Sequence, residues 1–91
     1  MSIQIAIPSP LRRFTAEDSL VEVQAETVDQ VLDKLDEQYP GFRSRLCEDS
    51  GKLRRFFNIY LDGEDVRFLD NLTTEVKPGS DVSIIPAIAG G

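Results

Sequence analysis

FFNIYLDGEDVRF, at residues 56–68, is the stretch of sequence that decides the fold. From Phe57 onward apolar side chains alternate with more polar ones, and a period of two is typical of a strand that buries one face. The Asp62-Gly63 pair that follows is a strong signal for a two-residue hairpin turn. We therefore predict a strand over 56–61, a tight turn and a short return strand over 66–68.

A last strand is predicted further along the chain. Leu69 and Leu72 are expected to form a packed crossover, and the Lys-Pro-Gly-Ser run at 77–80 predicts a turn before a strand over 82–85. Pro86 ends this strand because proline has no N–H group to donate to the ladder. The side chains expected to face the core are Phe57, Ile59, Leu61, Val82 and Ile84. Those expected on the opposite face are Asn58, Tyr60, Ser83 and Ile85.

Two strands and one helix precede the hairpin. Alternating isoleucines predict a strand over 3–7, and alternating valines predict a second strand over 20–24. Thr27, followed three residues later by Gln30, is a capping-box signature that marks the start of a helix. A Pro-Gly pair ends this helix, and one further helical turn is expected over 42–46. The apolar stripe of the helix consists of Val28, Val31, Leu32, Leu35 and Tyr39.

The order of elements defines the fold class. Strand, strand, helix, strand, short strand, strand predicts an α+β domain of the β-grasp (ubiquitin-like) type, with a mixed sheet of about five strands packed on one main helix. The first and last strands are expected to pair as parallel neighbours at the centre of the sheet. We assign residues 1–86 to this domain and residues 87–91 to a flexible C-terminal tail ending in Gly-Gly.

Charge and composition exclude several classes of function. The chain of 91 residues carries 10 basic and 16 acidic side chains, for a net charge of −6. Such a surface is repelled by phosphate backbones and anionic lipid, so we expect neither nucleic acid nor a membrane as a partner. The first residues lack the features of a signal peptide, and no apolar run is long enough to span a bilayer. We expect a cytoplasmic protein.

The inventory of reactive side chains is short. There is no histidine and only one cysteine, which excludes the common zinc sites and histidine-based general base catalysis. The sequence contains neither the dinucleotide-binding pattern GxGxxG nor the phosphate-binding pattern GxxxxGK[ST]. Cys47 lies at a predicted helix end, where the helix dipole disfavours a thiolate, so we interpret it as a structural or incidental thiol. The basic residues of the segment 52–55 either contact an acidic partner or form a solvated edge, and both readings stay open.

The C-terminus is the one feature that suggests chemistry. Gly90 and Gly91 follow the last predicted strand through a short tail of small residues. A frayed end or a cloning remnant would also leave such a sequence. However, a terminal carboxylate on two residues without side chains can enter a narrow channel and adopt backbone angles that other residues cannot. The Gly91 carboxylate is therefore a plausible reacting group.

At this point the sequence resembles a known family. The order of elements, the FFNIYLDGEDVRF stretch and above all the ending SIIPAIAGG at 83–91 are similar to the ubiquitin-like sulfur-carrier proteins of the ThiS/MoaD family. The resemblance covers nearly the whole chain. Within the family, the tail is most similar to that of the carrier that serves cysteine biosynthesis, which also reads Pro-Ala, an aliphatic residue and Ala-Gly-Gly.

This resemblance implies a protein cosubstrate and not an enzyme. A ubiquitin-activating-like adenylyltransferase/sulfurtransferase, using ATP and magnesium, would adenylate Gly91, with Gly90 as its required companion. Sulfur would displace AMP to leave a C-terminal thiocarboxylate, which passes its sulfur to an acceptor such as a pyridoxal-phosphate cysteine synthase. The chain itself is expected to bind no cofactor and no metal. The residues expected to contact partners are Tyr60, Ile85, Ala87, Ile88 and Ala89.

Three other readings stay open. The chain could be the small subunit of molybdopterin synthase, or a ubiquitin-like modifier that forms isopeptide bonds with lysine side chains. Both alternatives share the adenylation step and differ from the carrier of cysteine biosynthesis only at the acceptor. A stand-alone interaction domain with unused terminal glycines is the fourth reading. Neighbouring genes for a cysteine synthase or for a molybdopterin synthase large subunit would separate the first two pathways.

Overall fold

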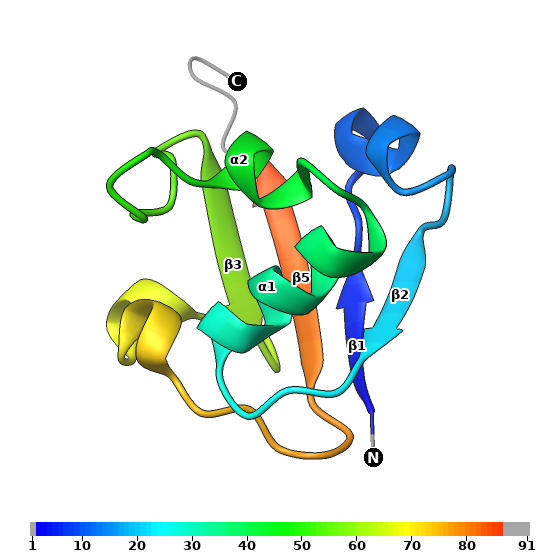
Figure 1. The fold of residues 1–91 in the computed structure, drawn as a ribbon. Coiled ribbons are helices and arrows are strands. Elements are labelled where there is room, and N and C mark those ends of the chain that lie inside the picture. The colour runs from blue at the N-terminus through cyan, green and yellow to red at the C-terminus, as the bar shows by residue number, and fades with distance from the viewer. Residues whose placement is uncertain (1, 87–91) are drawn as a thin grey trace.

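The structure is a computed structural model and describes residues 2–86. Five strands form one mixed sheet in the order β2-β1-β5-β3-β4 (Figure 1). The strands are β1 (Ile3–Ala6), β2 (Leu20–Val23), β3 (Phe57–Leu61), β4 (Glu64–Asp65) and β5 (Asp81–Pro86). The helices are α1 (Val28–Gln38) and α2 (Phe42–Leu46), with short 3₁₀ helices at Ser9–Phe14, Val66–Phe68 and Asn71–Thr73.

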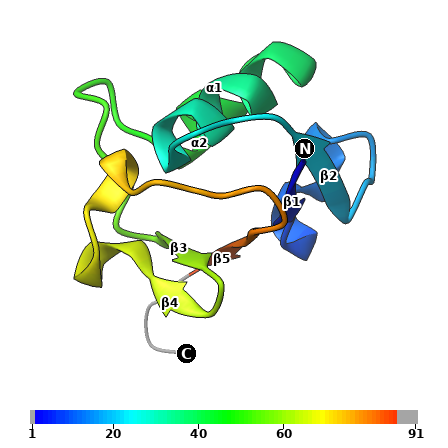
Figure 2. The same cartoon turned by 90° about the horizontal axis from the view of Figure 1, so that it is seen from below.

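The sheet topology confirms the predicted β-grasp. β1 pairs antiparallel with β2 and parallel with β5, which places the first and last strands side by side at the centre. β5 in turn pairs antiparallel with β3. Figure 2 shows α1 and α2 together on one side of the sheet. Within residues 2–86, the helical layer therefore covers only one face of the sheet.

Helix α1 begins as the sequence predicts, with one difference. The Gln30 backbone N–H donates to the Thr27 hydroxyl over 3.2 Å. The Gln30 side chain, however, accepts from the backbone N–H of Glu26 over 2.8 Å, one residue before the usual capping-box partner. Gln30 therefore forms hydrogen bonds with two residues that precede the helix. The Val76 backbone N–H also donates to the Glu26 carbonyl.

The apolar stripe of α1 closes the core against the inner face of the sheet. Tyr39 is the C-cap of the helix and is half-buried, whereas the other members of the predicted stripe are fully buried. Val82, Ile84 and Ile59 are buried as predicted, and Phe57 and Leu61 are half-buried and pack against the core. The largest fully buried side chains are Phe42, Ile3, Ile5, Ile7, Leu32, Leu35, Leu46 and Ile59.

The predicted return strand over 66–68 is wrong. Asp62 and Gly63 have φ values of 50° and 88°, the left-handed geometry of a tight two-residue turn, so the chain pairs again at once as Leu61↔Glu64. β4 is therefore Glu64–Asp65, and residues 66–68 form a 3₁₀ helix. The Asp65 carboxylate ends the pairing, because it accepts from the Arg67 backbone N–H over 2.9 Å and turns the chain away.

The crossover that follows is only partly packed. Leu72 lies against the core, as predicted, but Leu69 is 37% exposed. Leu69 is the C-cap of the first of two 3₁₀ helices, Val66–Phe68 and Asn71–Thr73. These short helices direct Val66 and Leu72 inward and leave Leu69 in solvent, so the predicted core role of Leu69 is wrong.

Candidate functional site

The C-terminal tail starts at a fixed point of the fold. β5 is the middle strand of the sheet, with β1 on one side and β3 on the other, and its last residue, Pro86, pairs with Phe57. β1 pairs with residues 81–83 only, so the end of β5 is bonded along one edge, to β3. The Phe57↔Pro86 pair places the root of the tail next to the start of β3. The five tail residues for which roles were predicted, Ala87, Ile88, Ala89, Gly90 and Gly91, lie outside the described residues.

The face of β3 and β5 opposite the helices carries the predicted outward side chains. Asn58 pairs with Ile85, and Tyr60 pairs with Ser83, so the four residues lie together on neighbouring strands. Ile85 is 41% exposed, whereas its chain neighbour Ile84 is 3% exposed. Asn58, Tyr60 and Ser83 are half-buried. We call these four residues the outer face.

The outer face contains an unused hydrogen-bond acceptor. The Oδ1 atom of Asn58 is buried and has no hydrogen-bond partner among residues 2–86. Buried polar atoms in native proteins are almost always satisfied, and an exception calls for an explanation. Asn58 lies one residue pair from Phe57↔Pro86, where the tail begins.

Sequence reasoning missed one exposed residue beside the tail root. Phe56 immediately precedes β3 and is 51% exposed, with the guanidinium of Arg55 5.2 Å from its ring centroid. The signal was present in the sequence, since the alternation that turns Phe57 inward also turns Phe56 outward. Phe56 and Ile85 are thus two large apolar side chains that are exposed near the tail end of the sheet.

Cys47 is a buried free thiol, which agrees with its interpretation as a structural or incidental thiol. It is 5% exposed, and burial raises its pKa above the ordinary value, although the nearby Arg43 guanidinium opposes this shift. A thiol with a raised pKa is mostly protonated at neutral pH and is a poor nucleophile. Among the described residues, no three or more histidine, cysteine or acidic side chains are grouped so that they could hold a metal ion. No helix in residues 2–86 could cross a membrane.

The arrangement defines a class of protein before any family is considered. A ubiquitin-like β-grasp domain carries the root of its C-terminal tail at the end of β5, beside a partly apolar sheet face, and its one thiol is buried with a raised pKa. The sequence model of the ThiS family matches residues 5–91. The chain belongs to the ThiS family, and the predicted family resemblance is confirmed.

Two relatives and one solved structure are similar to this chain over most of their length. "Sulfur carrier protein CysO" of Mycobacterium tuberculosis is 41% identical over 93 residues that cover all of both chains. CysO in the crystal structure of the Amycolatopsis orientalis BexX/CysO complex is 39% identical and has a TM-score of 0.91, with 98% of this chain and 99% of that chain covered. "Small archaeal modifier protein 3" of Haloferax volcanii is 38% identical over 65 residues, which cover 71% of this chain and 70% of that protein.

Proposed function

We propose that this chain is a sulfur carrier for cysteine biosynthesis, whose C-terminal Gly91 is converted into a thiocarboxylate. The observation that carries the proposal is the full-length similarity to CysO, at 41% identity. The position of Pro86 at the end of β5, paired with Phe57, supports it, because it suits a chain that presents a reacting terminus to other enzymes. The chain itself acts as a cosubstrate.

The proposed activation follows from the chemistry of carboxylates. A free carboxylate is a poor acyl donor, so one oxygen of Gly91 must first attack the α-phosphorus of ATP and release pyrophosphate. Sulfide, supplied by a sulfur donor, then attacks the carbonyl carbon of the acyl adenylate, and AMP leaves. ATP and magnesium are used by a ubiquitin-activating-like adenylyltransferase/sulfurtransferase. We expect this reaction to take place in the cytoplasm, where ATP is available.

Binding of a partner to the outer face would offset the entropy cost of ordering the tail. Ordering the five residues of the tail in a partner's channel costs on the order of 5 to 10 kcal/mol of backbone entropy. Residues as small as Ala87, Ala89, Gly90 and Gly91 offer little contact area to offset this cost. The partner must therefore bind the folded domain as well. Ile85 directly precedes the tail root at Pro86, and Tyr60 lies further along the same face, paired with Ser83. A CysO relative of this fold occurs in a complex with BexX, which supports partner docking as part of the function.

Intact-mass measurement tests the proposal. The chain is incubated with its adenylating enzyme, ATP, magnesium and sulfide, and exchange of one oxygen for sulfur should add about 16 Da. Gly90→Val should abolish the mass gain, because a β-branched side chain blocks the channel and restricts the backbone. Its free energy of unfolding should stay unchanged, which separates a tail effect from a folding defect. An unchanged mass of the wild-type chain with an active enzyme would refute the proposal.

The sulfur acceptor is tested in a second step. The thiocarboxylate form is mixed with a pyridoxal-phosphate cysteine synthase and an activated serine derivative, and the sulfur should bond to the β-carbon of that derivative as its leaving group departs. Hydrolysis of the bond to the Gly91 carbonyl then releases cysteine and restores the Gly91 carboxylate. The similarity to Small archaeal modifier protein 3 favours protein modification as a second candidate function. In that case, the adenylated chain should form adducts with lysine amines of target proteins, which are detected as isopeptide-linked species that survive reduction.

A further inference from the structure

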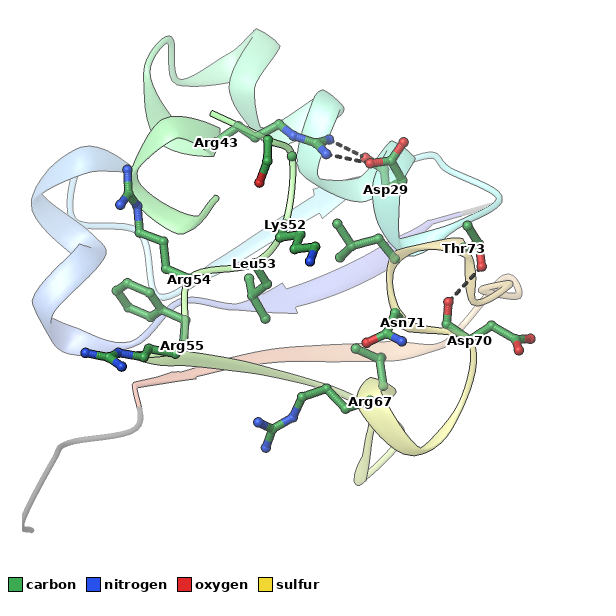
Figure 3. Close-up of a pocket in the computed structure, with 15 residues that line it drawn as sticks. Asp29, Arg43, Lys52, Leu53, Arg54, Arg55, Arg67, Asp70, Asn71 and Thr73 are labelled. Carbon is green, nitrogen blue, oxygen red and sulfur yellow. Dashed lines mark hydrogen bonds and ion pairs between the residues drawn. The ribbon is translucent and has the colours of Figure 1, made fainter. Parts of the chain in front are cut away.

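A groove of about 710 Å³ lies at the β3 edge of the domain, away from the outer face. One wall is the segment 50–55, which follows α2, and the other is formed by residues 66–73 with their two 3₁₀ helices. Figure 3 shows these two segments facing each other across the groove. Its apolar lining comprises Leu53, Phe57, Val66 and Leu72. We call this feature the basic groove, because five lysine and arginine residues line it.

The basic groove concentrates positive charge in an acidic protein. The whole chain has a net charge of −6 and contains 10 lysine and arginine residues. Five of these side chains line the groove, against only two carboxylates, Asp29 and Asp70. The five basic residues are Arg43, Lys52, Arg54, Arg55 and Arg67. Basic side chains therefore outnumber acidic ones in the lining of the groove, the reverse of the balance in the whole chain.

Of these five basic side chains, three form no ion pair within residues 2–86. Arg43 pairs with Asp29 and Asp33, and Arg67 pairs with Asp65. By contrast, Lys52, Arg54 and Arg55 form no ion pair with any residue between 2 and 86. All three are exposed. Their charges are thus available to an external group.

The Arg54 and Arg55 side chains are also oriented by weaker contacts. The Arg54 guanidinium donates to the Ser44 carbonyl over 3.2 Å, and the Arg55 guanidinium lies over the Phe56 ring. Neither contact neutralises the charge. Arginine retains unused N–H donors in such arrangements, because its guanidinium has five of them.

We propose that the basic groove binds an extended acidic segment of a partner protein, with carboxylates on the basic side chains and alternate apolar side chains on the lining. In Figure 3 the Arg54, Lys52 and Arg67 side chains extend in different directions and do not converge on one point. Cations spread along a groove suit several carboxylates on one strand, whereas a phosphate group requires donors that converge. A long nucleic acid is disfavoured by the overall charge of −6.

Such a site would add to docking on the outer face without replacing it. Exposed ion pairs contribute little individually and are screened by salt, so an isolated acidic peptide binds weakly. The same segment on a partner that already holds the outer face binds at a high effective concentration. The proposal does not depend on the sulfur-carrier role, because peptide binding requires no chemistry at Gly91.

The test uses the full chain labelled with ¹⁵N and an eight-residue peptide of alternating glutamate and leucine, at low salt. We expect amide chemical-shift changes in the segments 50–55 and 66–73. A matched peptide of alternating lysine and leucine should cause no change there. Shifts confined to the outer face would overturn the proposal. Inorganic phosphate is the third probe, and shifts of the same groove amides at equal or lower phosphate concentration would identify an anion site instead.

A pair of charge-reversal variants separates the groove from the net charge. Lys52→Glu combined with Arg55→Glu should weaken peptide binding about tenfold or more, because attractive pairs become repulsive ones. The control combines Lys34→Glu with Lys77→Glu, which changes the net charge equally at residues that do not line the groove. The control should bind within about twofold of the wild type. Equal losses in both variants would show that only overall charge matters and would overturn the proposal.

Discussion

The neighbours Ile84 and Ile85 allow the two faces of β5 to be tested with the same substitution. Ile84 is 3% exposed and pairs with Ile59 in the core, so Ile84→Ala should lower the free energy of unfolding by about 3 kcal/mol. Ile85 is 41% exposed on the outer face, so Ile85→Ala should cost about 1 kcal/mol or less. With an m-value of roughly 1.5 kcal/mol/M, the urea midpoint falls by about 2 M and by less than about 1 M, respectively.

Ile85→Ala should have little effect on stability but should clearly weaken the binding of a partner. Truncating an apolar anchor in an interface costs about 1 to 3 kcal/mol, which corresponds to a rise in Kd of about 5-fold to 150-fold. Isothermal titration calorimetry with the adenylating enzyme measures this rise for Ile85→Ala and for Tyr60→Ala. Leu20→Ala is the matched control, because Leu20 is 60% exposed but lies on β2 at the far edge of the sheet.

Two outcomes would refute the reasoning at different steps. Equal urea midpoints for Ile84→Ala and Ile85→Ala would contradict the assignment of the two faces. An unchanged affinity of Ile85→Ala and Tyr60→Ala for the enzyme would show that the outer face is not the docking surface. The proposed chemistry at Gly91 would survive that second result, since the mass measurement tests it independently.

Three further predictions concern the stability and reactivity of the domain. Thr27→Ala removes the hydroxyl that accepts from Gln30 and should lower the free energy of unfolding by about 1 kcal/mol, measured by urea titration. Hydrogen bonds from Arg67 hold the pKa of Asp65 below its ordinary value of 3.8, so this stabilisation is present above that pH and is lost as the pH falls through the lowered pKa. Asp65→Asn should therefore flatten the decline of the unfolding free energy between about pH 4 and pH 2, and an unaltered slope would contradict the role of this carboxylate. Burial raises the pKa of the Cys47 thiol, so iodoacetamide should alkylate it at least about tenfold more slowly in native protein than in urea, as followed by intact mass.

Most elements of the fold are determined by the sequence, because their signals are local. The Thr27 cap and the apolar stripe predict α1, and alternation predicts the buried Ile59, Val82 and Ile84. A tight turn at Asp62-Gly63 needs positive φ values, and this residue pair tolerates them well. The terminal Gly-Gly and the missing histidine likewise restrict the chemistry before any coordinates are considered.

The tertiary structure decides where the strand pairing ends after the Asp62-Gly63 turn. The sequence pattern of residues 66–68 suits a strand, yet the Asp65 carboxylate caps a 3₁₀ helix there. Leu69 is apolar but exposed for the same reason, since the direction of the chain after Asp65 decides which side chains reach the core. Local propensity cannot weigh a side-chain hydrogen bond against one more pair of strand residues.

The outer face and the basic groove also differ in how far the sequence predicts them. Alternation alone places Tyr60 and Ile85 on the outer face, because the period of a strand is a property of the backbone. That the Oδ1 atom of Asn58 is buried without a partner depends on its neighbours in space. The basic groove brings the segments 50–55 and 66–73 together although β3 separates them in sequence. Only the packing of these loops against α1 and β3 decides that their charges share one surface.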